Sequence, residues 1–271
     1  MTVDPDKKLD DCVFCALDLE TTGINPLTHR IVEVGMVRFT LKEIIETYEQ
    51  LVDPGMPIPP DVIRIHGITD EMVAGAPRIA DIRGNIAGFF TDSILVIHNP
   101  YFDLAFIDRC FREDGCDAPR FEAFDTVRLA RKAFPFLQNH RLVTLGKHFK
   151  ISGSNHRALS DALCCMEVFR QAIVSRPAGE MRTLRELLKY HGKPVRPRPG
   201  KTVVVRNGRR NGLTIGQAVR IRYADSGGMV TERNIVPLEF ISRGKTTYLR
   251  AHCLLRKEIR FFNRDGILEV L

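Results

Sequence analysis

Several features that define special classes of protein are missing from this 271-residue chain. No apolar run approaches the ~20 residues that a membrane-spanning helix needs, so we expect no membrane contact. The N-terminal stretch MTVDPDKKLDD lacks the apolar core of a secretory signal. The seven cysteines are odd in number and scattered, which favours reduced thiols over a disulfide framework and predicts a cytoplasmic protein.

A zinc site is not expected either. Cys12 and Cys15 form a C-x-x-C pair, but no second pair and no nearby histidine completes a set of four ligands. Because the surrounding residues are typical of a strand, we interpret both cysteines as core residues.

Acidic residues are scarce only in the last third of the chain. Residues 1–176 contain 20 Lys and Arg against 25 Asp and Glu, a balance of −5. Residues 177–271 contain 20 Lys and Arg against 8 Asp and Glu, a balance of +12. This asymmetry predicts two modules, of which the basic one is a candidate for contacting a phosphate backbone. The alternative is a solvated basic surface that only aids solubility.

The stretch from Cys12 to Gly23, CVFCALDLETTG, is an apolar run that ends in two acids and a turn. Strand side chains repeat with period two, so Asp18 and Glu20 should point to the same side. Two carboxylates on one side of a buried strand repel each other and are costly to desolvate, and a divalent cation between them offsets that cost. The alternative is a strand that reaches the surface with two solvated acids.

Hydrophobic periodicity predicts an α/β order in the rest of the first module. Three further strands are expected, over residues 30–39, 44–52 and 93–98. Thr69 is a candidate cap for a short helix. The expected helices cover residues 70–73, 79–90, 102–112, 125–134 and 142–149, and a last helix ends near residue 174.

Three more candidate residues fall at the ends of these elements. Asp103 falls in the first turn of the 102–112 helix, where the preceding strand ends, and ligand sites of α/β proteins favour strand ends. Asp161 lies one turn into the last helix, and His156 lies in the loop or first turn before it. The alternatives are an ordinary first-turn acid for Asp103, favoured by the helix dipole, and a capping or surface role for the His156–Asp161 pair.

Together, these four acids and the histidine resemble the DEDDh 3′–5′ exonucleases, and within them the epsilon proofreading subunit of bacterial replicative DNA polymerases. The resemblance covers roughly residues 12–176 and implies a ribonuclease H-like fold, a mixed sheet flanked by helices. The matching segments are Asp18-Leu-Glu20-Thr21-Thr22-Gly23, His98-Asn-Pro-Tyr-Phe-Asp103, His156-Arg-Ala-Leu-Ser-Asp161 and Ile65-His-Gly-Ile-Thr-Asp-Glu-Met-Val73.

The resemblance also implies phosphodiester hydrolysis with two divalent cations, Mg²⁺ or Mn²⁺, about 4 Å apart. Asp18 would bridge the two ions, and Glu20 and Asp161 would hold the ion on the nucleophile side. Asp103 would act through a water on the metal, and His156 would be the general base for the attacking water. The residues implied to hold the terminal nucleotide and its 3′ hydroxyl are Thr21, Thr22, Gly23, His66, Asn99 and Phe102.

Beyond residue 176 the pattern changes. A proline and a glycine break the last helix, residues 181–191 predict a basic amphipathic helix, and residues 193–200 predict an extended Pro/Arg-rich linker. Short strands joined by Gly-rich turns follow a short helix over 213–217, which is the pattern of a small β-barrel. The predicted parts are an exonuclease domain over 1–176, a basic helix and linker over 177–212, and a C-terminal domain over 213–271.

The last part, over about 213–269, resembles the WYL domain, an SH3-like barrel. The namesake motif is Thr247-Tyr-Leu249, with Thr in place of Trp, and Gly266 stands where the family often has a second arginine. The resemblance implies binding of nucleic acid or a nucleotide ligand. Because Gly266 replaces the second arginine, ligand binding that depends on two arginines is in doubt. The candidate ligand-binding residues are Arg222, Tyr223, Tyr248, Arg256 and Arg260. The alternative is that the tyrosines pack the barrel and the arginines cover it.

These features predict a metal-dependent 3′–5′ exonuclease that releases nucleoside monophosphates from the 3′ ends of DNA, with a C-terminal domain that binds nucleic acid or a regulatory nucleotide. The DNA is taken to be single-stranded, and DNA is favoured over RNA because the motifs resemble the proofreading branch. An RNA-trimming exoribonuclease is the alternative. A WYL-type regulatory binding protein with a vestigial nuclease fold is a second alternative. A polymerase-bound subunit is a third, although no clamp- or polymerase-binding segment is apparent.

Overall fold

We describe a computed structural model of the chain, which divides into two compact units, residues 1–201 and 202–271. Each unit is described by itself. The structure describes residues 4–24, 26, 29–112, 121–151, 156–175, 181–197, 213, 218–224, 229–243, 246–254 and 258–271. No helix in this part of the chain has the length and apolar character that crossing a bilayer requires.

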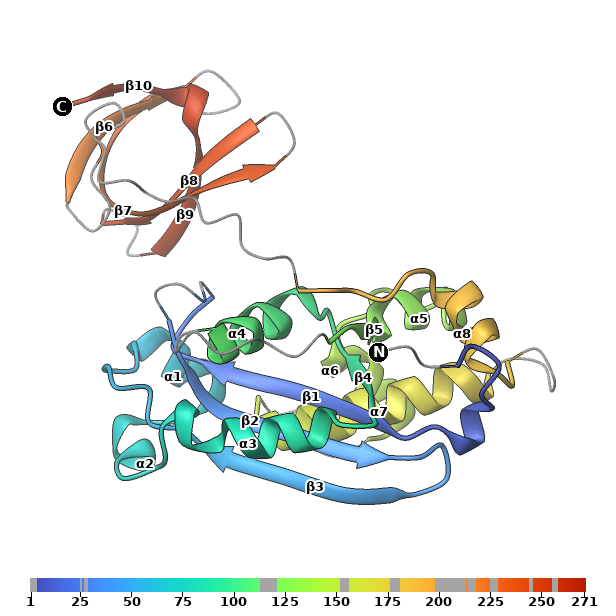
Figure 1. Cartoon of the computed structure of the whole chain (residues 1–271). Helices are drawn as coiled ribbons and strands as arrows, with labels where there is room; N and C mark the ends of the chain where they lie inside the picture. Colours follow the sequence, from blue (N-terminus) through green and yellow to red (C-terminus); the bar gives the residue numbers. More distant parts are fainter. Residues whose placement is uncertain are drawn as a thin grey trace. The chain divides into compact units, whose positions relative to one another are not determined.

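The first unit is built on a five-stranded mixed sheet with the strand order β3-β2-β1-β4-β5 (Figure 1). The first three strands form an antiparallel meander, and β4 and β5 run parallel to β1. The central position of β1 fits its sequence because both of its faces are apolar and buried. The strands are β1 (Phe14–Thr21), β2 (Ile31–Phe39), β3 (Ile44–Leu51), β4 (Ile94–Ile97) and β5 (Ala123–Asp125).

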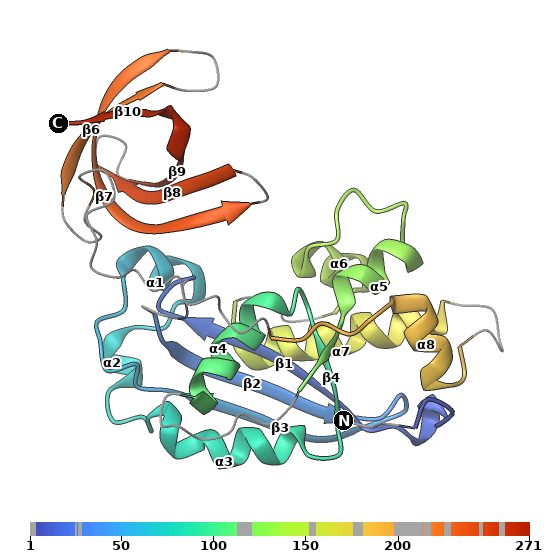
Figure 2. The same ribbon diagram turned by 45° about the horizontal axis from the view of Figure 1, so that its top comes forward.

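Helices cover both faces of this sheet (Figures 1 and 2). Helices α3 and α4 share an apolar core with one face, and α5 to α8 share a second core with the other. A smaller core joins α1 and α2 to β2. The helices are α1 (Pro60–His66), α2 (Asp70–Val73), α3 (Ile79–Phe90), α4 (Tyr101–Arg112), α5 (Thr126–Ala133), α6 (Leu142–Phe149), α7 (Ala158–Val174) and α8 (Leu184–His191).

The side chains of β1 alternate between these two cores. The even-numbered ones face α7, where the rings of Phe14 and Phe169 lie 4.8 Å apart between centroids. Because the alternation continues along the strand, Asp18 and Glu20 also lie on the α7 face. The odd-numbered side chains face the core of α3 and α4, and these are Cys15, Leu17 and Leu19.

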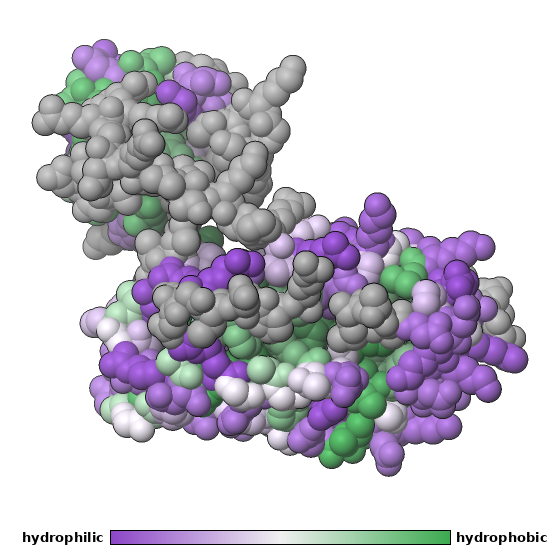
Figure 3. Space-filling view, in the orientation of Figure 1, coloured by the Kyte–Doolittle hydropathy of each residue, from purple (hydrophilic) through white to green (hydrophobic). Residues whose placement is uncertain are grey.

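Residues 181–197, which belong to the region predicted as a basic helix and linker, pack against the first unit. Leu184 and Leu187 of α8 are buried in the core that α7 shares. Val195 pairs with Ala123 of β5 and adds a bridge at the edge of the sheet. The surface over α8 is mainly hydrophilic (Figure 3), as expected for a helix that buries only one face.

The second unit is an antiparallel five-stranded sheet with the strand order β10-β6-β7-β8-β9. Ile221, Ile235 and Leu249 lie at the centre of its apolar core. Among the described residues no pairing joins β9 to β10, so the strand pairing shows an antiparallel sheet, and the SH3-like barrel stays a prediction. The strands are β6 (Val219–Ala224), β7 (Val230–Arg243), β8 (Thr246–Cys253), β9 (Glu258–Asn263) and β10 (Ile267–Val270).

The predicted elements differ from the structure at a few places. Helix α1, over residues 60–66, and the three-residue strand β5 were not predicted, because both are too short to show a period. Thr69 precedes α2, but its side chain forms no capping hydrogen bond. Residues 230–243 form one strand instead of two, since a register shift accommodates Pro237. The helix predicted over 213–217 lies outside the described residues, except for residue 213.

Candidate active site

Strands β1 and β2 place two of the predicted acids beside each other. Asp18 lies opposite Gly35 of β2, and Glu20 lies opposite Glu33. Paired residues of an antiparallel ladder share a face, so all four lie on the side that α7 covers. Asp18 and Glu20 are both partly buried, which disfavours the alternative of two fully solvated acids.

Asp103 reaches the same region from the first turn of α4. This helix follows β4, which lies beside β1 in parallel register. The Asp103 side chain is buried, and the backbone N–H of Leu19 donates to its carboxylate. Because Leu19 lies between Asp18 and Glu20, this hydrogen bond brings the third acid to the other two.

The start of α7 supplies the last two residues. Asp161 lies in the first turn and is buried, and His156 precedes the helix with a backbone φ of 52°, in the left-handed region. One side-chain ligand atom each of Glu20, His156 and Asp161 lie within 4.8 Å of one another. The structure thus brings together acids from β1, α4 and α7 with one exposed histidine.

Burial and mutual repulsion dominate the electrostatics of this cluster. Burial, followed by the charges of Asp103 and Asp161, raises the pKa of Asp18 well above its usual range. Burial raises the pKa of Glu20 to about 8 and that of Asp103 to about 8. Burial also raises the pKa of Asp161 to about 6, and the neighbouring His156 opposes this rise. The four acids cannot all ionise at neutral pH without a compensating charge.

Divalent cations fit this set of ligands. The Oδ1 atom of Asp161 is buried and has no hydrogen-bond partner among the described residues. A buried carboxylate oxygen without a partner is costly, and a bound cation removes that cost. Carboxylate oxygens are also the ligands that hard divalent cations prefer.

The loop after β1 uses its hydroxyl groups to hold its own shape. Thr21 Oγ1 donates to the Gly23 carbonyl at 2.7 Å, and Thr22 Oγ1 accepts the N–H of Arg30 at 3.0 Å. Gly23 adopts a φ of 154°, and a Cβ on it would lie 2.5 Å from the His29 ring. These contacts give a defined loop beside the acids, and a nucleotide contact by its three predicted residues stays a prediction.

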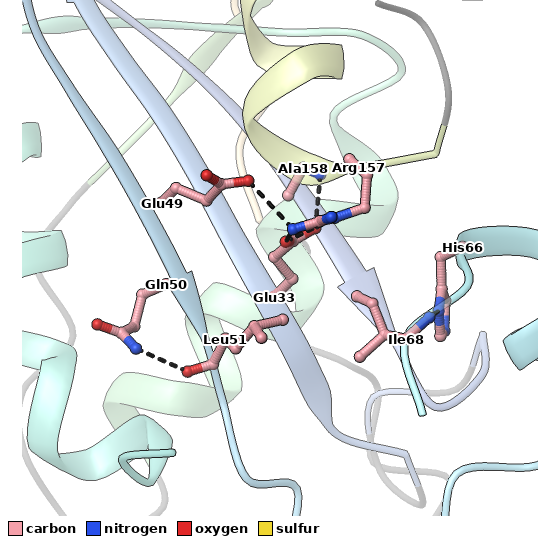
Figure 4. Close-up of polar contacts among 8 residues, drawn as sticks. All are labelled: Glu33, Glu49, Gln50, Leu51, His66, Ile68, Arg157 and Ala158. Carbon is pink, nitrogen blue, oxygen red and sulfur yellow. Dashed lines mark hydrogen bonds and ion pairs between the residues drawn. The ribbon is translucent and has the colours of Figure 1, made fainter. Parts of the chain in front are cut away.

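His66 lies at the end of α1 and is buried. Its Nδ1 accepts the N–H of Ile68 at 3.0 Å (Figure 4). Burial lowers the pKa of His66, and the backbone of Thr21 opposes this effect. The structure therefore connects His66 to the loop after β1, although its contact with a nucleotide is still a prediction.

Asn99 and Phe102 flank the start of α4. Asn99 is exposed with a φ of 63°, and its N–H donates to the Asp125 carboxylate at 3.3 Å. The ring of Phe102 packs on Phe106 with 5.0 Å between centroids. Both residues lie within four positions of Asp103, so they border the cluster of acids.

Two buried acids of this region were not singled out from the sequence. Glu33 is fully buried and accepts hydrogen bonds from Arg157 and Ala158 (Figure 4). Asp125 is also buried, and its side chain caps α5 by accepting the N–H of Val127. The available signal for Glu33 is a single acid within the apolar run IVEVGMV.

Two candidate ligand-binding residues of the second unit are engaged within it. Arg222 forms an ion pair with Glu269 of β10 at 3.0 Å. The Tyr223 ring packs edge-on against Phe262 with 5.1 Å between centroids, and its hydroxyl accepts the N–H of Asn263 at 3.2 Å. These contacts agree with a packing role for this tyrosine.

The structure describes two of the three other candidates of the second unit. Tyr248 and Arg260 are partly buried, and Arg256 lies outside the described residues. A Cβ at Gly266 would lie 2.5 Å from the Ala224 carbonyl oxygen. Close packing therefore explains why glycine, and not arginine, stands at this position.

A mixed sheet whose central strand carries two acids, joined by acids from two helices, defines a nuclease of the ribonuclease H-like class. The chain belongs to the exonuclease family: the family model described as "Exonuclease" matches residues 15–169, more than half of the chain. A second family model, described as "WYL domain", matches residues 210–270. The class of the first domain is that of the DEDDh 3′–5′ exonucleases.

Similar proteins match the first domain. The chain is 37% identical over 163 residues to the DNA polymerase III subunit epsilon of Treponema pallidum, covering 59% of this chain and 76% of that protein. It is 37% identical over 153 residues to the PolC-type DNA polymerase III of Halalkalibacterium halodurans, covering 56% and 11%. The chain thus spans about a tenth of the PolC-type relatives that it matches. A solved structure, Exonuclease X in complex with 5′ overhanging duplex DNA, is 26% identical with a TM-score of 0.51, covering 66% of this chain and 99% of that one.

Proposed function

We propose that this protein is a metal-dependent 3′–5′ exonuclease that hydrolyses phosphodiester bonds at DNA 3′ ends and releases nucleoside monophosphates. The observation that carries the proposal is a cluster of four acids from three segments with a histidine at its edge. Membership of the exonuclease family and the similarity to an epsilon subunit support the same reaction. The residues of the cluster are Asp18, Glu20, Asp103, His156 and Asp161.

The four acids would hold two divalent cations, Mg²⁺ or Mn²⁺. When bound, such ions supply charge stabilisation for the attacking and leaving oxygens of the phosphodiester. Without them, burial and repulsion raise the pKa of Asp18, Glu20 and Asp103, and the acids stay partly protonated. Ionisation of the acids is therefore coupled to cation binding.

His156 is the general base in this proposal. Its ring lies with the carboxylates of Glu20 and Asp161, so a proton accepted from the attacking water gives an imidazolium stabilised by two acids. His156→Ala should lower kcat by about 10²- to 10⁴-fold and leave DNA binding nearly intact. Single-turnover hydrolysis and fluorescence anisotropy measure the two effects, and wild-type turnover in this variant would defeat the assignment.

DNA, and single-stranded DNA in particular, is the proposed substrate. The named relatives are a PolC-type DNA polymerase III and a DNA polymerase III subunit epsilon, and Exonuclease X was solved with 5′ overhanging duplex DNA, which supports DNA as the polymer. The terminal nucleotide would lie against the loop of residues 21–23, with His66, Asn99 and Phe102 around it. Faster hydrolysis of RNA would move the substrate to the exoribonuclease alternative.

The C-terminal part, residues 213–271, is proposed to be an SH3-like barrel that binds nucleic acid or a nucleotide. These residues contain 10 Lys and Arg against 6 Asp and Glu, a balance of +4, which supports a phosphate-containing ligand. The candidate ligand-binding residues are Arg222, Tyr223, Tyr248, Arg256 and Arg260, of which Arg222 and Tyr223 also have contacts within the sheet. We also propose that the segment predicted as 177–212 is divided, with residues 181–197 belonging to the exonuclease domain.

A polymerase partner is a further proposal, and the identity with an epsilon subunit supports it. Co-purification of a polymerase with the tagged full-length chain would test this.

The cytoplasmic location expected from reduced cysteines stays a prediction, and Cys12 and Cys15 are both buried thiols.

The main test is a nuclease assay with Mg²⁺ or Mn²⁺ on 5′-labelled and 3′-labelled DNA and RNA of the same sequence. We expect stepwise shortening of 5′-labelled DNA, release of a labelled mononucleotide from 3′-labelled DNA, and no hydrolysis in EDTA. Asp18→Asn, purified in parallel, controls for contaminating nucleases. No hydrolysis of any polymer with either ion would contradict the proposal and favour a regulatory protein with a vestigial nuclease fold.

A further inference from the structure

A buried carboxylate on β2 has no part in the reaction as described so far. Glu33 is fully buried in a strand whose other central residues are apolar. A buried acid is costly unless it is paired and hydrogen-bonded. The contacts of Glu33 therefore indicate what it contributes to the site.

Glu33 holds the start of α7 (Figure 4). Its carboxylate accepts the N–H of Ala158 at 2.8 Å, and it accepts hydrogen bonds from Nη2 and Nε of Arg157 at 2.6 Å and 2.9 Å. Arg157, the residue at the N-cap position of α7, forms no side-chain capping bond of its own. Glu33 thus acts as an N-cap from another strand, since it satisfies a first-turn N–H and places an acid at the positive end of the helix dipole.

Gly35 provides the space for this contact. A Cβ at Gly35 would lie 2.1 Å from the backbone carbon of Ala158 and 2.1 Å from the backbone nitrogen of Leu159. The start of α7 therefore rests directly on the backbone of β2. The contact at Gly35 sets the distance between β2 and α7. The hydrogen bonds of Glu33 set which residue of α7 lies against Gly35.

The same two residues of β2 lie beside the acids of β1. Gly35 is paired with Asp18, and Glu33 is paired with Glu20. The docking point of α7 is therefore one strand away from both acids, about 5 Å in the hydrogen-bonding direction of a sheet. A shift of the helix start on β2 would change its distance to the acids directly.

On the helix side, the segment that Glu33 holds carries the histidine and the fourth acid. His156 immediately precedes Arg157 and has a left-handed φ of 52°, which a non-glycine residue keeps only when surrounding contacts hold it. The N–H of Asp161 donates to the carbonyl of Arg157 at 2.9 Å. Fixing Arg157 and Ala158 therefore fixes the residues on both sides of them.

Neutralisation of an arginine does not account for Glu33. The side chain of Arg157 is 40% exposed, and it also contacts the exposed Glu49 at 3.3 Å. The guanidinium could be solvated or paired without any buried acid. A fully buried partner is explained by the backbone N–H of Ala158, which solvent does not reach.

We propose that Glu33 is a positioning residue for hydrolysis: it fixes the start of α7 on β2 so that His156 and Asp161 meet Glu20. This inference rests on the proposed function, because it assigns Glu33 a role in the same reaction. The described hydrogen bonds of Glu33 go to Arg157 and Ala158 and not to His156 or Asp161, on which it acts through these two residues, apart from its charge, which adds to the repulsion on Asp161.

Glu33→Gln in the full-length protein tests the inference. The amide keeps the shape, but its NH₂ group has no acceptor on a guanidinium, so it cannot serve both partners. We expect kcat on labelled DNA to fall by about 10- to 100-fold, the usual cost of losing a support of this kind. KM should stay within about twofold, since no substrate contact is removed.

Amide hydrogen exchange gives a readout that does not depend on activity. In Glu33→Gln, exchange at residues 158–161 should rise by at least about tenfold, with the C-terminal half of α7 unchanged. Global destabilisation would instead raise exchange along the whole helix. Glu49→Gln is the matched control, because it removes the other, exposed contact of Arg157 and should match the wild type in both measurements.

Unchanged kcat in a folded Glu33→Gln variant would overturn the inference, whether or not the local exchange rises. If circular dichroism shows that this variant does not fold, Arg157→Lys takes its place, because it keeps the charge but loses the paired donors. It must then show lower kcat and faster exchange at residues 158–161, and their absence would overturn the inference. A wild-type protein without nuclease activity would contradict the proposed function, whereas an active wild type with a fully active Glu33→Gln contradicts only the positioning role.

Discussion

The two units of the chain hold their charged side chains in opposite ways. In the first unit, acids such as Asp18 and Asp103 gather in a buried cluster, where burial and their neighbours raise the pKa of each. In the second unit, the exposed side chain of Arg222 on β6 is paired with Glu269 of the neighbouring strand β10 at 3.0 Å. Near the acids of the first arrangement, the charges of Arg157 and His156 offset the repulsion only in part, whereas Arg222 of the second is already paired.

This difference shows that net charge is a weaker guide to a binding site than uncompensated burial. The region with a balance of −5 contains the cluster that needs cations, and its acids are few among many solvated ones. The second unit, residues 202–271, has 13 Lys and Arg against 6 Asp and Glu, a balance of +7, and part of this charge forms ion pairs across neighbouring strands. Shifted pKa values at a buried cluster are therefore the better indicator of a functional site.

The largest effect should follow from removing the central acid. Asp18→Asn should lower kcat by about 10⁴-fold, the scale of losing a member of a catalytic set. Its free energy of unfolding in EDTA should not fall, because one of the mutually repelling acids is gone. Single-turnover hydrolysis and urea unfolding measure these two effects.

The exposed Asp10 offers a matched control for this experiment. Asp10→Asn should change neither hydrolysis nor stability. If Asp18→Asn were clearly less stable than the wild type in EDTA, the acids would not be repelling one another, and the contrast between the two units would disappear.

A core substitution in α8 tests where the first unit ends. Leu187 is fully buried in the core shared with α7, so Leu187→Ala should cost about 2–5 kcal/mol of unfolding free energy. Only the unfolding transition of the first unit should move in calorimetry. Leu188→Ala, at a partly buried position of the same helix, is the control and should cost clearly less. If only the unfolding transition of the second unit shifted, α8 would belong to the second unit and not to the first.

Acid should weaken the first unit through His98. Burial lowers the pKa of this histidine to about 4, and its Nδ1 lies 2.8 Å from Thr126 Oγ1. Above the ordinary histidine pKa, His98 is neutral in both states and has no effect on pH dependence. As the pH falls from about 6.5 towards 4, the unfolded chain takes up a proton that the folded chain does not, so stability is lost at about 1.4 kcal/mol per pH unit.

Urea unfolding at two pH values measures this contribution. Between pH 7.5 and 5, the loss of stability in His98→Gln should be about 2 kcal/mol smaller than in the wild type. An equal loss in both proteins would show that His98 can be protonated in the folded state. His252→Gln in the second unit controls for a general effect of replacing a histidine.

The acids of the site were predictable because their signals are local. Asp18 and Glu20 follow an apolar run with period two, and Asp103 and Asp161 fall in first turns of strongly patterned helices. The mixed order of strands and helices was predictable for the same reason. The class of protein followed from these local signals and their order along the chain.

What could not be predicted depends on contacts between distant residues. Glu33 and Arg157 are 124 positions apart, and nothing in either segment indicates the other. Strand β5 has three residues and is defined only by its pairing with β4. Gly266 was interpreted as a departure from a family pattern, whereas the structure shows a close approach of two backbone segments.

The smallest effect is expected for the paired cation of the second unit. Arg222→Gln removes an exposed ion pair with Glu269, so the free energy of unfolding should change by less than about 1 kcal/mol. Binding of an oligonucleotide by the full-length chain should also stay within about twofold of the wild type, because this arginine is already paired. Arg260→Gln, a second candidate on β9, is measured beside it for comparison. If Arg222→Gln instead clearly weakens oligonucleotide binding, the ion pair with Glu269 must open so that Arg222 can contact the ligand. The second unit would then resemble the first, because its charge would also be compensated by a bound ligand.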